Sequence, residues 1–309
     1  MANILLISSR VAALLGFILY TLFEILRGLV LLCVPATYEP VKTVAGEIIL
    51  ITGAGSGLGR QLAIKLARKQ AKIVIWDIDV KGLEDTYKMI KDAGGTVHHY
   101  KCDLTKREEV YDVAEQVTKD VGDVTILINN AGVTSGYWLW EIPDHLIQRT
   151  FDVNSIALFW TAKAFLPKMI QENRGHIVTI ASMAGHTACS KLCDYSASKF
   201  AAYGFDEGLR LDLAAKGITG VKTTVVCPYF IAQTGMFNDV VSALPTLSVD
   251  VVAERTILGI TREDLVIMLP AYFRFTFWLK WFVPWSVVSK FVIGMVPDAV
   301  PKQGSFVKY

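Results

Sequence analysis

A buried strand that runs into a glycine-rich turn constrains this chain more than any other feature. Four consecutive apolar residues, 48–51, are typical of a strand covered on both faces, as in a parallel sheet. The turn over 52–59 reads Thr-Gly-Ala-Gly-Ser-Gly-Leu-Gly, and residues 61–70 then show helical spacing. Together they predict a site for the pyrophosphate of a nucleotide, because glycines let the backbone approach the phosphates and helix N–H groups favour negative charge.

The spacing of the glycines departs from the common dinucleotide pattern. Leu58 stands where the third glycine of G-x-G-x-x-G would be, so the pattern is T-G-x-x-x-G-x-G. Glycines alone are a weak signal, and a strand–helix corner without a ligand is the alternative interpretation. The candidate cofactor contacts in this turn are Gly53, Ser56, Gly57, Leu58 and Gly59.

Strand and helix signals alternate over residues 44–270, which predicts an α/β fold, a Rossmann-type doubly wound parallel sheet. The expected strand order is 3-2-1-4-5-6-7, with ligands at the carboxyl ends of the strands where the order reverses. One long helix over 143–170 is expected to carry Asn154 near its middle. The expected strands cover residues 48–51, 72–79, 96–101, 124–128, 176–180, 221–226 and 265–269.

Residues 11–34 are apolar except for Thr21, Glu24 and Arg27, which predicts an N-terminal hydrophobic anchor helix long enough to span a bilayer. A signal peptide is the alternative, because residues 34–36 resemble a cleavage site, but the apolar run is long for one. The polar positions leave open whether the segment spans a membrane or lies in its surface. We divide the chain into a membrane anchor and linker (1–43), a Rossmann domain (44–270) and an aromatic C-terminal extension (271–309).

Aromatic residues in the C-terminal extension alternate with Arg274, Lys280 and Lys290. Trp and Tyr beside Lys or Arg favour the membrane–water boundary, whereas aromatics at helical spacing also pack on a core. A substrate lid and a membrane-surface segment therefore both stay open.

Charge and cysteine usage exclude other classes of function. The chain has 31 Lys and Arg against 29 Asp and Glu, so nucleic acid is not expected as a partner. Its five cysteines are scattered without zinc spacing, and they are typical of reduced thiols in a domain that faces the cytosol. No metal site is expected.

Asp77 ends the second predicted strand, 18 residues after Gly59. A carboxylate at this position can accept hydrogen bonds from both hydroxyls of an adenosine ribose and repels a 2′-phosphate. Because Ser56 rather than a basic residue lies in the glycine turn, the sequence favours NAD over NADP. The alternatives are a solvated aspartate at a strand end and an NADP-dependent reductase of the same fold.

Tyr195 and Lys199 are four residues apart, so a helix places them on one face. A nearby cation favours the phenolate, and such a pair can exchange a proton with an alcohol while a hydride passes to a nicotinamide. Ser182, thirteen residues before the tyrosine, is a candidate to hold the substrate oxygen, and Asn154 to relay protons through water. Y-x-x-x-K alone is usually structural, but here it follows the glycine turn and the Asn-Asn-Ala-Gly turn at 129–132.

With these motifs in order, residues 44–269 resemble the short-chain dehydrogenase/reductase family. The resemblance implies a triad of Ser182, Tyr195 and Lys199, with Asn154 as a fourth member and Lys199 also bonded to the nicotinamide ribose. The turn before Thr234 is one residue longer than in related chains, which leaves its contact to the carboxamide open. The other implied cofactor contacts are Asp103 and Leu104 at the adenine, Asn130, Ala131 and Gly132 in the second turn, and Pro228 and Thr234 beside the nicotinamide.

Residues 46–60, 76–78 and 234–237 resemble more narrowly a membrane-associated subgroup of retinol and 17-beta-hydroxysteroid dehydrogenases. This resemblance implies an NAD-dependent oxidoreductase acting on a lipophilic alcohol or ketone. The expected location is the endoplasmic reticulum membrane or the monolayer of a lipid droplet, with the catalytic domain facing the cytosol, and a homodimer stays open. The alternative function is a structural protein of the same surfaces with vestigial activity.

Overall fold

The computed structural model describes residues 2–32, 41–237 and 240–299, which fall into two units, Met1–Lys42 and Thr43–Tyr309. The first unit holds helix α1 (Ala2–Leu32), so the predicted N-terminal helix is present. Leu14, Phe17 and Leu19 of this helix are 59%, 66% and 67% exposed. The sequence left open whether this segment spans a membrane; within the described residues, no helix is both long and apolar enough to cross one. The end of the predicted anchor, residues 33 and 34, lies outside these ranges.

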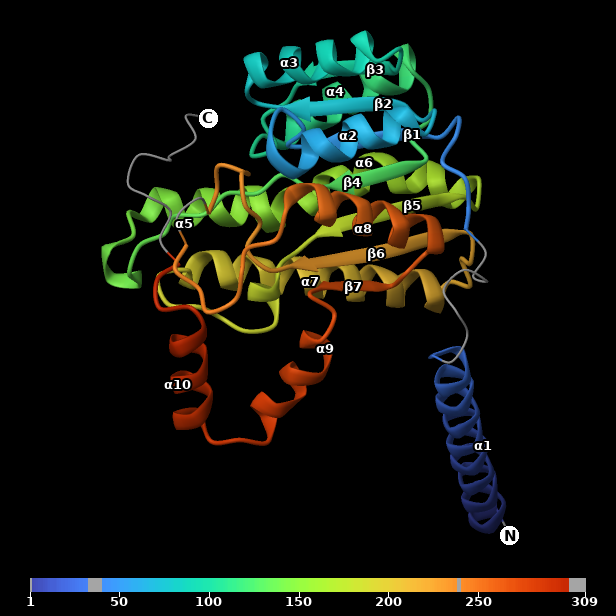
Figure 1. Ribbon diagram of the computed structural model, residues 1–309. Coiled ribbons are helices and arrows are strands. Elements are labelled where there is room, and N and C mark those ends of the chain that lie inside the picture. The colour runs from blue at the N-terminus through green and yellow to red at the C-terminus, as the bar shows by residue number, and fades with distance from the viewer. Residues whose placement is uncertain (1, 33–40, 238–239, 300–309) are drawn as a thin grey trace. The chain divides into compact units, whose positions relative to one another are not determined.

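The second unit is built on a seven-stranded parallel sheet in the order β3-β2-β1-β4-β5-β6-β7, which confirms the predicted Rossmann-type fold (Figure 1). The order reverses between β1 and β4, where Ile49 pairs with Ile126. A crevice forms at the carboxyl ends of two such strands, because their connections leave in opposite directions. The strands are β1 (Ile48–Thr52), β2 (Lys72–Asp77), β3 (Thr96–Lys101), β4 (Ile126–Asn129), β5 (Gly175–Ile180), β6 (Val221–Pro228) and β7 (Val266–Leu269).

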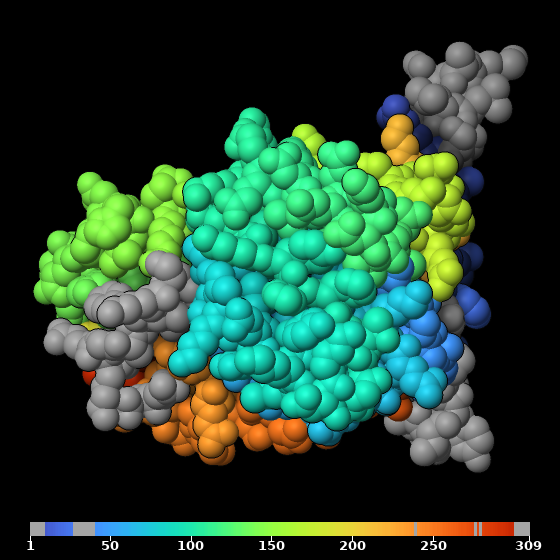
Figure 2. All heavy atoms as spheres, turned by 90° about the horizontal axis from the view of Figure 1, so that it is seen from above, coloured from blue at the N-terminus to red at the C-terminus, as the bar shows by residue number. Residues whose placement is uncertain are grey.

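Helices cover both faces of the sheet. Ile49 and Ile51 of β1 join the core on one face, and Leu50 joins the core on the other, as the two-residue period of a strand requires. Figure 2 looks onto the β3 edge, where α3 and α4 form a continuous surface of packed side chains. One face carries α2 (Gly57–Arg68), α3 (Val80–Asp92) and α8 (Val249–Arg262); the other carries α4 (Arg107–Asp120), α6 (Ala157–Gln171) and α7 (Cys193–Ala215).

The long helix predicted over 143–170 is interrupted. Between α5 (Asp144–Phe151) and α6, residues Asp152–Ile156 form a π-helical turn, η3, and Asn154 lies within it. A π turn widens a helix by one residue, and such turns are frequent at functional positions. Sequence periodicity missed it because one inserted residue hardly changes the apolar pattern. A second difference is that α2 begins at Gly57, inside the glycine turn rather than after it.

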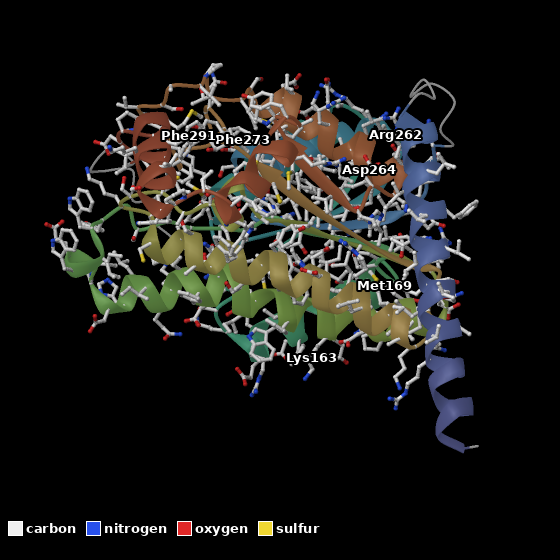
Figure 3. All side chains as sticks on the ribbon, turned by 90° about the horizontal axis from the view of Figure 1, so that it is seen from below. Lys163, Met169, Arg262, Asp264, Phe273 and Phe291 are labelled. Atoms are coloured by element: carbon white, nitrogen blue, oxygen red, sulfur yellow. The ribbon has the colours of Figure 1, made fainter. Side chains whose placement is uncertain are left out.

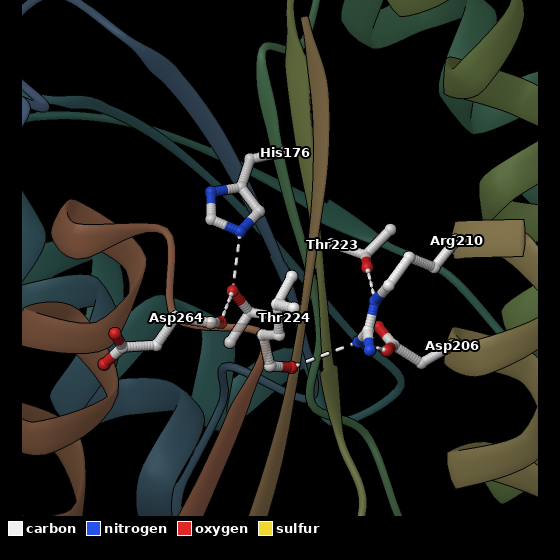
Figure 4. A network of polar contacts seen from close by, with 7 residues as sticks. His176, Asp206, Arg210, Thr223, Thr224 and Asp264 are labelled. Atoms are coloured by element: carbon white, nitrogen blue, oxygen red, sulfur yellow. Dashed lines mark hydrogen bonds and ion pairs between the residues drawn. The ribbon is translucent and has the colours of Figure 1, made fainter. Parts of the chain in front are cut away.

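A polar network joins the amino ends of β5, β6 and β7 (Figure 4). His176 Nε2 lies 2.8 Å from Thr224 Oγ1, and that hydroxyl donates to the Asp264 carbonyl at 2.6 Å. Because the threonine has one proton to give, the histidine is the donor at Nε2. Beyond the sheet, Arg210 Nε donates to Thr223 Oγ1 at 3.0 Å. This network lies at the opposite end of the strands from the crevice, and we assign it to stability of the sheet.

The extension after β7 forms α9 (Phe273–Thr276), η5 (Phe277–Trp281) and α10 (Trp285–Met295), which fold back on the second unit (Figure 1). At one end Lys280 Nζ donates to the carbonyl of His186. At the other end Lys191 pairs with Asp298 at 3.2 Å, and the Met295 carbonyl accepts from the backbone of residue 243 at 2.8 Å. Both ends therefore hold the loop that separates η4 (Met183–Gly185) from α7.

Candidate active site

The glycine turn after β1 packs so closely that side chains cannot fit in it. A Cβ atom on Gly59 would lie 2.2 Å from the Gly53 carbonyl oxygen, and one on Gly53 would lie 2.8 Å from the Cα of Ala131. Gly53 and Gly57 have φ angles of +65° and +51°, which glycine adopts without strain. Ser56 precedes α2 but makes no side-chain cap, so the first N–H groups of this helix remain able to bind an anion.

The Asn-Asn-Ala-Gly turn after β4 is bonded to the glycine turn. Thr52 Oγ1 accepts from the backbone N–H groups of Asn130 at 3.0 Å and Ala131 at 3.1 Å. Asn130 Nδ2 donates in return to the carbonyls of Thr52 at 2.9 Å and Gly53 at 3.1 Å. The Asn130 side chain thus fixes one loop on the other, which is a positioning role within the predicted cofactor site.

Asp77 ends β2 beside the glycine turn. Its Oδ2 accepts from the Gly55 N–H at 2.8 Å, and its Oδ1 accepts from the Asp79 N–H at 3.0 Å. Burial raises the pKa of this carboxyl, and the two backbone N–H groups counteract the shift. The carboxylate lines the crevice with remaining lone pairs available to a ligand.

The turn after β6 reaches the glycine turn in spite of its additional residue. Thr234 packs against Gly57: a Cβ atom on this glycine would lie 3.3 Å from the Thr234 Cβ. Gln233, directly before it, has a φ of +61° and bends the chain inward.

On the other side of the site, Asp103 Oδ1 accepts from the hydroxyl of Thr105 at 2.7 Å.

Three side chains converge where β5 ends and α7 begins. Tyr195 and Lys199 lie on one face of α7, with the Lys199 Nζ 5.7 Å from the centre of the tyrosine ring. The Nζ donates to the Ile180 carbonyl at 2.9 Å. Ser182 follows β5, and its hydroxyl lies close enough to the Tyr195 phenol to favour the phenolate. The Ser182 Oγ also accepts from the Ala184 N–H at 3.0 Å, which fixes its orientation.

Burial shifts the pKa values of the tyrosine and the lysine in opposite directions. It raises the pKa of Tyr195 to about 12, although the nearby Ser182 hydroxyl favours the phenolate. It lowers the pKa of Lys199 to about 8. Before a ligand binds, the phenol is therefore protonated at neutral pH, whereas the amine titrates close to it.

Asn154 is placed by the π turn and joined to the tyrosine through Ser198. Asn154 and the backbone of Val133 exchange two hydrogen bonds of 2.8 Å. Asn154 Nδ2 also donates to Ser198 Oγ at 3.0 Å, and this hydroxyl donates to the Tyr195 carbonyl at 2.7 Å. A Cβ atom on Gly132 would lie 3.4 Å from both Asn154 Oδ1 and Lys199 Nζ, so these two polar atoms face the same space.

One cavity of about 510 Å³ connects these groups. At one end it is bounded by the glycine turn and Asp77, and at the other by apolar side chains of the C-terminal extension. Figure 3 labels two of the latter, Phe273 at the start of α9 and Phe291 on α10. Across the described ranges, no group of His, Cys, Asp and Glu could hold a metal ion. The apolar wall includes Leu192, Phe230, Phe237, Phe273, Phe277 and Phe291.

The family model for short chain dehydrogenases matches residues 47–244. The chain belongs to the short-chain dehydrogenase family. This dehydrogenase is 46% identical to human (Homo sapiens) epidermal retinol dehydrogenase 2 over 269 residues, which covers 85% of this chain and 86% of the relative. It is 45% identical to human estradiol 17-beta-dehydrogenase 11 over 261 residues, which covers 84% of this chain and 87% of that relative. It is thus an oxidoreductase homologous to retinol and hydroxysteroid dehydrogenases.

Solved structures with the same fold hold nicotinamide cofactors. A short-chain dehydrogenase from Burkholderia phymatum in complex with NAD has a TM-score of 0.70 and 29% identity, covering 76% of this chain and 93% of that one. A metagenomic short-chain oxidoreductase in complex with NADP has a TM-score of 0.63 and 26% identity, and the match covers 74% of this chain and 96% of that one. The family therefore supports a nicotinamide cofactor without deciding between the two.

Most residues that the sequence predicted for this dehydrogenase line the one cavity. Two of them do not appear in its described wall: Gly59 is enclosed by the glycine turn, and Asn154 lies behind Val133. Sequence reasoning missed Ser198, whose contacts depend on the π turn. The predicted residues in the wall are Gly53, Ser56, Gly57, Leu58, Asp77, Asp103, Leu104, Asn130, Ala131, Gly132, Ser182, Tyr195, Lys199, Pro228 and Thr234.

Proposed function

We propose that this chain is an NAD-dependent oxidoreductase that interconverts a lipophilic alcohol, of the retinol or hydroxysteroid type, and its aldehyde or ketone. One observation carries the proposal: a single cavity joins Asp77 and the glycine turn to Tyr195, Lys199 and a wall of apolar side chains. A polar end suits a dinucleotide, an apolar end suits a lipophilic molecule, and the tyrosine lies where the two meet.

Tyr195 is the group that exchanges the proton of the alcohol. Its phenol donates to a carbonyl oxygen in reduction, and its phenolate accepts the hydroxyl proton in oxidation. Ser182, whose hydroxyl lies beside the same phenol, orients the substrate oxygen. The Lys199 ammonium stabilises the phenolate across the 5.7 Å to the ring centre. Asn154 Oδ1 and Lys199 Nζ both lie near Gly132, which allows the asparagine to support a proton relay through the lysine.

The residues of the polar end fit a nicotinamide dinucleotide. The first turn of α2 lacks a side-chain cap, and the glycines leave room for a pyrophosphate at its backbone. The Asp77 carboxylate suits the two hydroxyls of an adenosine ribose and disfavours a 2′-phosphate, which supports NAD. Bound there, the nicotinamide would supply the hydride exchange, and Lys199 would hold its ribose.

Membrane attachment accounts for the exposed apolar side chains of α1. Val11, Leu15 and Phe23 are 50%, 55% and 61% exposed in the first unit, and their burial in lipid stabilises attachment. We place the protein at the endoplasmic reticulum membrane or a lipid-droplet monolayer, with the catalytic unit facing the cytosol. Deletion of residues 1–35 should lower the share of the chain found in the membrane and droplet fractions of cells. Unchanged fractionation would show that another segment attaches the chain to the membrane.

The test of the activity is turnover by the purified full chain. We expect retinol or a hydroxysteroid to be oxidised with NAD, followed as NADH absorbance and by chromatography of the carbonyl product. A structural role with vestigial activity is less favoured, because the groups for proton exchange are assembled in one cavity. Cofactor binding without turnover across a panel of lipophilic alcohols would support that alternative.

A further inference from the structure

Helix α10 buries one apolar side and exposes further apolar residues next to it. Towards the core, Val288 is buried and Met295 lines the cavity. Towards solvent, Trp285 and Ile293 are 77% and 59% exposed. A helix that covers a cavity in water normally carries polar residues on its outer side. The exposed surface of α10 combines Trp285 and Ile293 with Ser286 and Lys290, and such a mixture fits a boundary between lipid and water.

Three side chains at this helix line the cavity and are also accessible to solvent. Val283, Val287 and Phe291 are 36%, 52% and 57% exposed. Their displacement would connect the apolar end of the cavity to the exterior. A molecule could then pass from an apolar medium to Tyr195 without crossing water.

The charge and the aromatic residues around this wall indicate which medium it meets. Trp281 and Phe282, just before α10, are 77% and 79% exposed. Residues 271–297 contain Arg274, Lys280 and Lys290 and no Asp or Glu. Tryptophan together with cations and without acids is the composition of a segment at the surface of a phospholipid layer.

We propose that the segment from Trp281 to Ile293 docks on a phospholipid surface and that Val283, Val287 and Phe291 form a portal through which the lipophilic substrate enters the cavity from the lipid. The proposal rests on the proposed function for the identity of the substrate. The surface contact itself is independent of turnover. A second copy of this chain is the competing occupant, but the one charge of this segment, on Lys290, would find no acid on the same segment of a second copy.

Tryptophan fluorescence tests the contact in the full chain, because residues 1–40 contain no tryptophan. Vesicles of phosphatidylcholine and phosphatidylserine with brominated acyl chains should quench the emission, since bromine quenches only indoles that reach the acyl region. The double variant Trp281→Ser, Trp285→Ser should lose most of this quenching. The matched control is Trp140→Ser, because Trp140 is 79% exposed but does not line the cavity. Equal quenching in the wild type and the double variant would overturn the docking.

Kinetics test the portal. Val287→Glu places a charge on the lipid side of the wall, so the apparent KM for an alcohol delivered in the same vesicles should rise about tenfold or more. The KM for a short water-soluble alcohol should rise by a smaller factor, because this alcohol does not enter from the lipid. Val251→Glu is the control, since Val251 on α8 is 50% exposed and is not a wall residue. An equal rise for both alcohols in Val287→Glu would contradict the portal.

Two further outcomes are separated by these measurements. If sedimentation shows a dimer that the double tryptophan variant converts to a monomer, and bromine does not quench the wild type, the patch binds a second copy and the proposal is wrong. If bromine quenches the wild type but no alcohol is turned over, the proposed function fails while the lipid contact stands.

Discussion

The Lys199 ammonium lies 5.7 Å from the centre of the Tyr195 ring and is held there by a 2.9 Å hydrogen bond to the carbonyl of Ile180. The carbonyl belongs to the last residue of β5, so the sheet itself positions the charge beside the phenol. Burial places the two pKa values at about 8 and about 12. The lysine is therefore the group whose protonation state most affects how easily the tyrosine ionises near neutral pH.

Replacement of Tyr195 by phenylalanine should remove turnover and leave cofactor binding intact. The ring keeps its packing, but no group remains to exchange the proton, and such a loss costs a factor of about 10² to 10⁴ in kcat. Turnover and a fluorescence titration with NADH measure the two effects. Tyr203→Phe is the control, because Tyr203 lies on the same helix but not in the cavity wall. A variant as active as the wild type would eliminate the proposed mechanism.

Alcohol oxidation should rise with pH in the wild type. The base is the phenolate of Tyr195, whose pKa is raised to about 12, so each step towards alkaline pH increases its fraction. Lys199→Met removes the cation that favours the phenolate and should lower kcat at pH 7 by about tenfold or more. Lys199→Arg keeps a charge that does not titrate and should recover part of the rate. Superimposable profiles of kcat against pH for the wild type and Lys199→Met would contradict this role.

Asp77→Ala should reverse the cofactor preference. It removes a charged acceptor for the ribose hydroxyls, so the KM for NAD should rise about tenfold to a hundredfold, while the KM for NADP should fall because the repulsion of the 2′-phosphate is gone. Asp79→Ala is the matched control: this carboxylate lies two residues further on and caps α3 through the Lys81 N–H. If both variants change the ratio of the two KM values equally, Asp77 does not select the cofactor.

Two Gly→Ala variants should have opposite effects on stability. Gly59→Ala forces a methyl group within 2.2 Å of the Gly53 carbonyl, so the turn must distort; we expect a lower Tm and weaker NADH binding. Gly208→Ala, in α7, meets no heavy atom within 4 Å and should stabilise the helix by about 0.5–1 kcal/mol. Thermal unfolding of both variants measures the contrast. A Tm for Gly59→Ala equal to that of the wild type would rule out the close packing.

Acidification should loosen the contact between the C-terminal extension and the loop before α7. The His186 ring packs between the rings of Tyr203 and Phe277, with centre-to-centre distances of 4.5 Å and 5.1 Å. Burial, and to a lesser extent the charge of the nearby Lys280, lowers the pKa of this histidine to about 4. The unfolded chain binds this proton near pH 6.5, so stability is full above that value and falls as the pH drops from about 6.5 towards 4. His186→Phe keeps the ring and should lose less Tm than the wild type between pH 8 and pH 5. An identical loss in both would remove His186 as the cause.

The fold and most of the candidate site were predictable because their signals are local. Residues 48–51 read as a strand because both faces of β1 are buried, and the expected sheet order is confirmed. Tyr195 and Lys199 were predicted to share a face because a helix fixes the spacing of any two residues four apart. The break at η3 was not predictable, since one residue inserted into a helix leaves almost no trace in the apolar pattern.

The sequence by itself determined the cofactor-type turn, the charge at Asp77 and the pair on α7, because each depends on neighbours within a few residues. Only the tertiary structure decided how distant segments complete the site: Ser198 joins Asn154 to Tyr195, and the extension after β7 closes the apolar end of the cavity. The physical reason is that burial, pKa shifts and cavity walls arise from contacts between residues far apart in the chain, and neither periodicity nor spacing encodes these contacts.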